Sequence, residues 1–117
     1  MSDFPLFAKN PLNRIAPVSQ FTDHVEGYVF DGADGSQMAF WTAKSDRISS
    51  EHAHDFDEYV LVVEGLATVI IGKERTVLTV GKEIVIPKGT KQRMSVTAGT
   101  RTIHVFGGKR AQRVAHS

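Results

Sequence analysis

The sequence predicts an all-β fold, a sandwich or barrel of short antiparallel strands with little or no helix. Runs rich in Val, Ile, Thr, Phe and Tyr follow one another between residues 25 and 106, bounded by Gly, Asp or Pro, as is typical of strands. No segment sustains the 3.6-residue period of a helix that would connect parallel neighbours. Glu64-Gly65 and Gly72-Lys73 each separate two such runs at hairpin spacing, where glycine accepts a positive φ without strain.

Eight strands are expected in chain order within one domain that spans residues 25–108. Their ranges are Val25–Phe30, Ser36–Ala43, Asp57–Val63, Ala67–Ile71, Glu74–Val80, Glu83–Ile86, Lys91–Thr97 and Arg101–Phe106. Residues 1–24 combine aromatic side chains with three prolines, and we expect an extended arm that lies along the barrel and covers a sheet edge. Residues 109–117 are expected to form a basic C-terminal tail.

Composition narrows the classes of function. The chain has 117 residues, a net charge of +1 and no cysteine, which excludes disulfides, thiolate metal sites and a thiol nucleophile. Lys109, Arg110 and Arg113 form the only basic cluster, and we interpret it as a solvated tail or a subunit contact rather than a nucleic-acid site. Residues 1–10 lack the apolar run of a signal peptide or membrane anchor, so a cytoplasmic protein without nucleic-acid or membrane partners is expected.

Two histidines and a glutamate in one short segment are the main chemical signal. His52, His54 and Glu58 share parity, and side chains two residues apart on a strand point to the same face. Two imidazole nitrogens and a carboxylate suit a divalent first-row transition metal better than magnesium or calcium. The alternative is a degenerate site that binds metal weakly or holds only water.

These residues belong to two spaced motifs that resemble those of small single-domain cupins. The first, His-x-His, three residues, Glu, six residues and Gly, and the second, Gly, five residues, Pro, one residue and Gly, are matched by His52, His54, Glu58, Gly65, Gly81, Pro87 and Gly89. The resemblance implies a jelly-roll barrel that holds one metal through three histidines and a glutamate. Two positions depart from the pattern: Asp46 replaces a turn glycine and Gln92 replaces the third histidine.

The replacement at Gln92 leaves three good ligands and several roles for the amide. Three roles are open for Gln92: it coordinates the metal loosely, it holds a metal-bound water, or it contacts the substrate. Two histidines and one carboxylate with open positions suit non-haem Fe(II), so iron is favoured among Fe, Mn, Ni and Zn. His104, on the last expected strand, either supplies the missing nitrogen, acts as acid or base, or is a structural histidine; parity alone does not decide.

Alternation also suggests apolar walls for a cavity. Val60 and Val62 share parity with Glu58, and Met94 shares it with Gln92. On an earlier strand Met38 and Phe40 lie on one face and Trp41 on the other, and either set can close the barrel.

The leading hypothesis is a metal-dependent enzyme that acts on a small organic molecule, with dioxygenase chemistry first and isomerase or lyase chemistry also open. The alternative is a non-catalytic module that binds a small ligand or sugar, such as a sensor, with a degenerate metal site. A structural protein with an unused barrel is a third. A homodimer formed by sheet-face or arm contacts is expected, because the arm is apolar and because the resemblance to small cupins implies a dimer.

Overall fold

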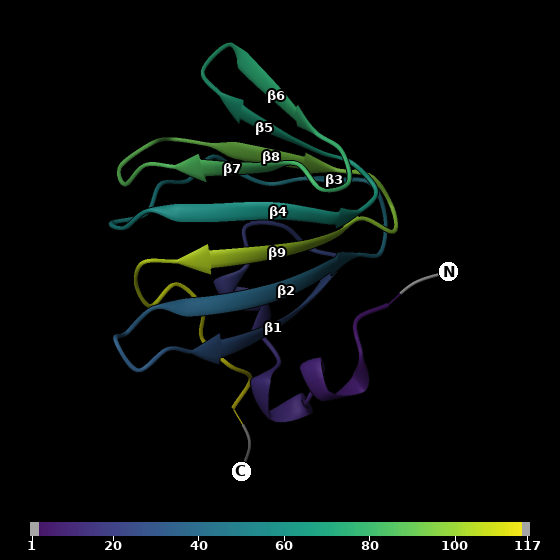
Figure 1. Cartoon of the computed structure of the whole chain (residues 1–117), viewed down its shortest axis with the longest axis vertical. Coiled ribbons are helices and arrows are strands. Elements are labelled where there is room, and N and C mark those ends of the chain that lie inside the picture. Colours follow the sequence, from purple (N-terminus) through teal and green to yellow (C-terminus); the bar gives the residue numbers. More distant parts are fainter. Residues whose placement is uncertain (1–2, 116–117) are drawn as a thin grey trace.

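A computed structural model describes residues 3–115, which form nine strands in two antiparallel sheets (Figure 1). The five-stranded sheet has the order β1-β2-β9-β4-β7 and the four-stranded sheet the order β3-β8-β5-β6. The bounds are β1 Val25–Asp31, β2 Gln37–Ala43, β3 Arg47–Ile48, β4 Glu58–Glu64, β5 Ala67–Ile71, β6 Glu74–Leu78, β7 Glu83–Ile86, β8 Arg93–Val96 and β9 Arg101–Phe106. The all-β antiparallel prediction is confirmed.

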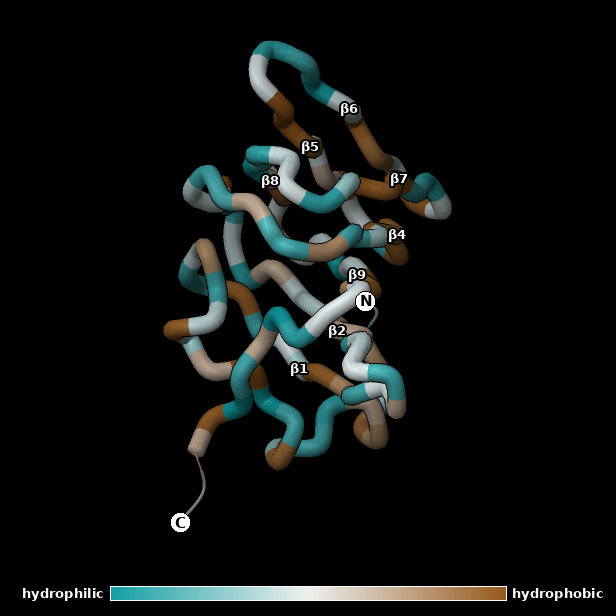
Figure 2. Tube along the Cα trace, turned by 90° about the vertical axis from the view of Figure 1, so that its left-hand side faces the viewer, coloured by the Kyte–Doolittle hydropathy of each residue, from teal (hydrophilic) through white to brown (hydrophobic). Residues whose placement is uncertain are grey.

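Most strands lie where the sequence places them, and the differences have local causes. β3 was not expected, because two residues are too few to show alternation; it pairs with β8 through Arg47 and Val96. β6 ends at Leu78 rather than at Val80, because the chain turns at Gly81, which has a φ of 84°. In Figure 2 the tip of the β5-β6 hairpin is hydrophilic while both of its strands carry hydrophobic stretches.

The core consists of two clusters. One joins the two sheets, with Val60 and Val62 of β4 against Val69 of β5 and Leu78 of β6, each at most 3% exposed. The other is formed by β1, β2 and β9 together with both terminal segments; its members are Ile15, Val29, Ala39, Phe106 and Ala111. The terminal segments are therefore part of the core.

The N-terminal arm is not extended throughout, which corrects the expectation from its prolines. It contains three single-turn 3-10 helices, η1 Leu6–Ala8, η2 Pro11–Asn13 and η3 Pro17–Ser19. The fixed φ of proline suits the first position of such a turn, and Pro11 and Pro17 occupy it. Residues 1 and 2 of the arm, and 116 and 117 of the tail, lie outside the described residues.

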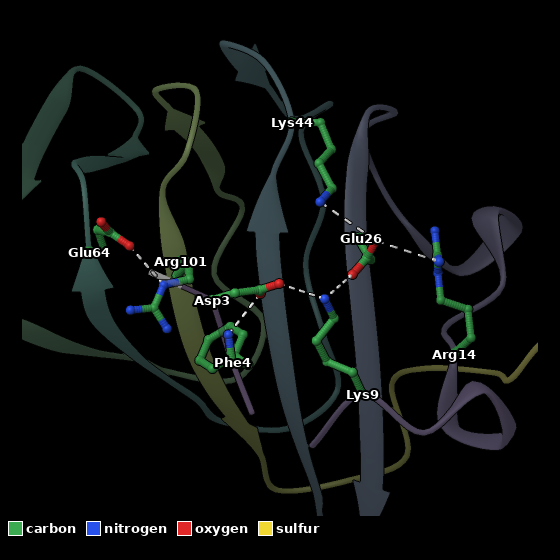
Figure 3. Close-up of polar contacts among 8 residues, drawn as sticks. All are labelled: Asp3, Phe4, Lys9, Arg14, Glu26, Lys44, Glu64 and Arg101. Atoms are coloured by element: carbon green, nitrogen blue, oxygen red, sulfur yellow. Dashed lines mark hydrogen bonds and ion pairs between the residues drawn. The ribbon is translucent and has the colours of Figure 1, made fainter. Parts of the chain in front are cut away.

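The start of the arm covers the outer face of the five-stranded sheet (Figure 3). Phe4 meets the Phe40 ring edge-on at 5.2 Å and lies beneath the Arg101 guanidinium. Lys9 bridges Asp3 at 2.7 Å and Glu26 at 3.3 Å. Since such surface pairs contribute at most about 1 kcal/mol each, the apolar contact of Phe4 is the firmer attachment.

The C-terminal segment is bound to the barrel, so the interpretation of a solvated tail is wrong for residues 110–114. The buried Gln37 side chain accepts hydrogen bonds from the backbone N–H groups of Arg110 and Ala111 and donates to the Ala111 carbonyl. Arg113 pairs with Ile15 in an isolated bridge. These contacts, remote in sequence, fix the backbone from which the Arg110 side chain extends.

Within residues 3–115, none of the helices has the length and apolar character needed to cross a membrane.

Candidate functional site

His52, His54 and Glu58 come together as the sequence predicts. One ligand atom from each lies within 4.8 Å of the other two. The segment before β4 is irregular, and β4 begins only at Glu58. His52 is held by a bridge to Gln92, with backbone hydrogen bonds of 3.0 and 2.8 Å in the two directions. The alignment therefore depends on pairing with the segment before β8 as well as on strand alternation.

His52 is oriented with one ring nitrogen available. Its Nδ1 lies 2.9 Å from the Ser50 carbonyl oxygen, and a carbonyl can only accept, so Nδ1 carries the proton in the neutral ring and Nε2 keeps its lone pair. The ring stacks on Phe21 at 3.9 Å. Burial lowers the pKa of His52 below its ordinary value, which favours the neutral form that binds metals.

His54 contributes a buried nitrogen without a hydrogen bond. Its Nε2 has no hydrogen-bond partner among the described residues and lies 3.6 Å from Oε1 of Glu58. Its ring stacks on Phe56 at 5.2 Å, and burial lowers the pKa of His54. An unsatisfied buried polar atom costs about 1–3 kcal/mol, so this nitrogen is suited to an additional partner.

Glu58 is held at both carboxylate oxygens. The Gln92 amide donates to Oε1 at 2.9 Å, and His104 Nδ1 lies 2.7 Å from Oε2. Burial alone would raise the pKa of Glu58, but the hydrogen bond and charge of His104, together with the Gln92 amide, lower it below the ordinary value. A charged carboxylate, 4% exposed, is thereby stabilised inside the barrel.

His104 faces the interior, which answers the question of parity on the last strand. Thr102, His104 and Phe106 of β9 are buried, while Ile103 and Val105 are only partly so. The second ring nitrogen of His104, Nε2, lies 2.9 Å from the Thr102 hydroxyl. Because both nitrogens have partners, His104 orients Glu58 in this arrangement rather than offering a free ligand atom.

Gln92 lies in the same network and is 2% exposed. One N–H of its amide donates to Glu58, and the amide oxygen is the atom that can accept a hydrogen bond from a ligand or coordinate an ion.

A cavity of about 90 Å³ adjoins the site. Its polar wall contains His52, Glu58, Gln92, His104 and Thr102, and its apolar wall contains Phe21, Trp41, Met94, Val96 and Phe106. Met94 lies where parity suggests.

Four other expected pocket residues lie elsewhere. Met38 and Phe40 belong to the outer face of β2: Met38 is 42% exposed and Phe40 contacts Phe4. Trp41, on the opposite face, takes their place, because the inward direction of β2 is set by pairing with β9, where Ala39 lies opposite His104. Val60 and Val62 are fully buried in the inter-sheet core and do not line the cavity.

Sequence reasoning missed Arg110 and Phe21 as lining residues. Arg110 lies over the rings of Phe21, Trp41 and Phe106 at 4.9, 5.1 and 5.6 Å. Burial lowers its pKa to about 10, so the guanidinium stays charged at neutral pH. Nothing in the sequence around Arg110 indicates that its side chain lies in the cavity. The sequence shows only a basic residue in a segment without an expected strand.

The fold and the site define a small β-barrel protein with a His/Glu cluster at one end of an inner strand. The family model described as "Cupin domain" matches residues 39–106, more than half of the chain, and the chain belongs to this family. No curated protein matches the sequence.

Solved structures share the fold at low sequence identity. A cupin superfamily protein from Desulfitobacterium hafniense is 15% identical, with a TM-score of 0.62 over 72% of this chain and 77% of that chain. A putative ethanolamine utilization protein Q from Salmonella typhimurium is 19% identical, with a TM-score of 0.62 over 70% and 68%. KdgF from Halomonas sp. is 15% identical, with a TM-score of 0.62 over 86% and 93%.

The hydrogen bonds that Gln92 and His104 make to Glu58 form a group that we call the Glu58 network. This network leads to a stability prediction that does not involve metal. In metal-free protein, His104→Phe keeps the aromatic contacts but leaves the Glu58 carboxylate with one donor, so we expect a loss of about 2–4 kcal/mol in the free energy of unfolding. In a Glu58→Gln background the same change should cost at least about 1 kcal/mol less, because no charge is then left buried. Urea unfolding of the four proteins measures the coupling, and a value below about 0.3 kcal/mol would contradict the network.

Proposed function

We propose that this cupin binds one divalent transition-metal ion through His52, His54 and Glu58 and is a metal-dependent enzyme that acts on a small organic molecule. The carrying observation is the buried Nε2 of His54, which has no hydrogen-bond partner among residues 3–115 and lies beside a charged carboxylate. The free Nε2 lone pair of His52 belongs to the same group of atoms. Neutral imidazoles and an ionised carboxylate are the protonation states that metal binding requires.

The spacing of the three side chains fits a single ion. Two ligands at about 2.1 Å from one ion are at most about 4.2 Å apart. The observed group lies within 4.8 Å, so closing it requires side-chain movements of less than about 1 Å. The Ser50 carbonyl on His52 and the His104 ring on Glu58 supply the outer contacts that orient metal ligands.

The donor set suits Fe, Mn, Ni or Zn, and iron remains our first choice because two histidines and a carboxylate leave positions open for dioxygen and substrate. Gln92 would be a weak fourth ligand through its amide oxygen, or would contact the substrate.

A bound ion of this kind supplies Lewis-acid polarisation or dioxygen activation, and we propose dioxygenase chemistry first, with isomerase or lyase chemistry as the variant. The residues of the chain have separate tasks. His104 holds its Nδ1 against Glu58 and fixes the carboxylate, while Trp41, Met94 and Phe106 exclude water and contact the apolar part of the substrate.

The second candidate is a non-catalytic module that binds a small ligand or sugar with a degenerate metal site. It is favoured by the two hydrogen bonds on Glu58, from Gln92 and His104, which satisfy the carboxylate without an ion. The two candidates differ in whether the protein takes up metal.

We also propose a homodimer that forms through the N-terminal arm. Leu6, Phe7 and Val18 are 85%, 84% and 87% exposed, and an apolar arm of this kind is suited to packing against a second copy of the chain.

Sedimentation of the wild-type protein should give a dimer, and the double variant Leu6→Asp/Phe7→Asp should give a monomer, because the charges oppose burial of the arm. A wild-type monomer would contradict the proposal.

Metal uptake is the test of the main proposal. After loading with Fe(II), Mn, Ni or Zn in turn and desalting, elemental analysis of the wild type should find about one ion per chain for at least one metal. His52→Ala and His54→Ala should each weaken its binding by about 100-fold or more, since each removes a ligand. His24→Asn is the matched control: His24 lies outside the cluster at a φ of 54°, a conformation that asparagine tolerates.

A wild type that takes up none of these metals would overturn the metal site and favour the second candidate. Wild-type affinity in both alanine variants would show that the ion binds elsewhere.

A further inference from the structure

The cavity beside the His/Glu cluster is lined by one cationic side chain, Arg110, and no ion pair among residues 3–115 neutralises it. Arg110 donates one guanidinium N–H to the Ser19 carbonyl, a neutral acceptor. Among residues 3–115, no carboxylate lies within ion-pair distance of this guanidinium. Glu58 acts on it only at longer range, and both oxygens of Glu58 are already hydrogen-bonded.

Arg110 is held in position by contacts of both its backbone and its side chain. Its backbone N–H is held at 2.7 Å by the buried Gln37 side chain. Its guanidinium lies against Phe21, Trp41 and Phe106. These aromatic faces contribute to its stability, but they leave most of its five N–H donors free for a ligand.

A purely structural arginine at this position would be costly. Removing a guanidinium from water without a counter-charge is unfavourable, and burial lowers the pKa of Arg110 to about 10. An anionic ligand would offset that cost, and the fork of N–H groups matches the two oxygens of a carboxylate.

The other residues that line the cavity indicate the chemical character of the rest of the ligand. Phe21, Trp41, Met94 and Val96 are apolar residues that line the same cavity as Arg110 and the polar side chains. A ligand with an apolar body and one anionic end therefore fits better than a sugar or a polyanion.

We propose that Arg110 is a ligand-binding residue that holds the carboxylate of a small organic acid with an apolar body inside the barrel. The assignment deepens the proposed enzymatic function and rests on it for the statement that this acid is the substrate. With a divalent ion bound at His52, His54 and Glu58, the positive charges of ion and guanidinium would exceed the charge of Glu58 by two, which further favours an anion.

The test uses the metal-free protein, so that its result does not depend on metal binding. Trp41, the single tryptophan of the chain, lines the cavity and reports ligand binding by fluorescence. The probes are benzoate and benzamide, which have the same shape and differ in charge. Benzoate should bind the wild type at least about tenfold more tightly than benzamide.

Arg110→Met keeps an unbranched apolar stem and should weaken benzoate binding about tenfold or more while changing benzamide binding less than about twofold. Arg110→Lys keeps the charge but lacks the fork, and we expect a loss of at least about threefold; it replaces the methionine variant if that protein does not fold. Lys109→Met removes the same charge one residue earlier from an exposed side chain and should leave benzoate binding unchanged.

Three results would overturn the inference: equal binding of benzoate and benzamide, including no binding of either; wild-type benzoate affinity in the Arg110 variants; or an equal loss in Lys109→Met. Failure of the metal proposal gives a different pattern, in which no ion is taken up and benzoate binding still depends on Arg110.

Discussion

The buried carboxylate of Glu58 is the constraint around which the interior is arranged. A carboxylate inside an apolar barrel is stable only when hydrogen-bonded or paired, and its two partners come from different parts of the fold. His104 is on β9, next to β4 in the five-stranded sheet, while Gln92 precedes β8 of the other sheet. The hydrogen bonds of Glu58 therefore join the two sheets at the wall of the cavity.

The same constraint orders the histidines. His52 lies opposite Gln92 in a backbone bridge, so the residue that donates to Glu58 also positions the first imidazole. His54 then follows with its Nε2 directed at Glu58. The carboxylate, its donors and the two imidazoles thus form one connected group, and a change in His104 or Gln92 is expected to affect the site through Glu58.

The sequence predicts the strands and the His52, His54 and Glu58 cluster because both depend on short-range signals: alternation, turn glycines and a spaced motif. It does not decide which face of β2 is inward. Met38, Phe40 and Trp41 are all apolar, and the choice is made by the register with β9 and by Phe4, which covers Phe40. β3 escapes prediction because it is stabilised only by its pairing with β8.

Arg110 is the clearest case of a residue whose role the sequence does not reveal. Its position depends on Gln37, more than 70 residues earlier, and on the bridge between Ile15 and Arg113. A basic residue near a chain end is normally solvated, and only these long-range contacts place it among aromatic rings. The charge of the cavity is therefore a property of the tertiary structure.

The most direct measurement of the central claim is a crystal structure of the metal-loaded protein with data collected at the absorption edge of the bound metal. The account predicts one anomalous peak per chain, within about 2.0–2.3 Å of the Nε2 atoms of His52 and His54 and of a Glu58 oxygen. The contrary result is a loaded crystal with no peak among these three side chains, or a peak bound by other residues.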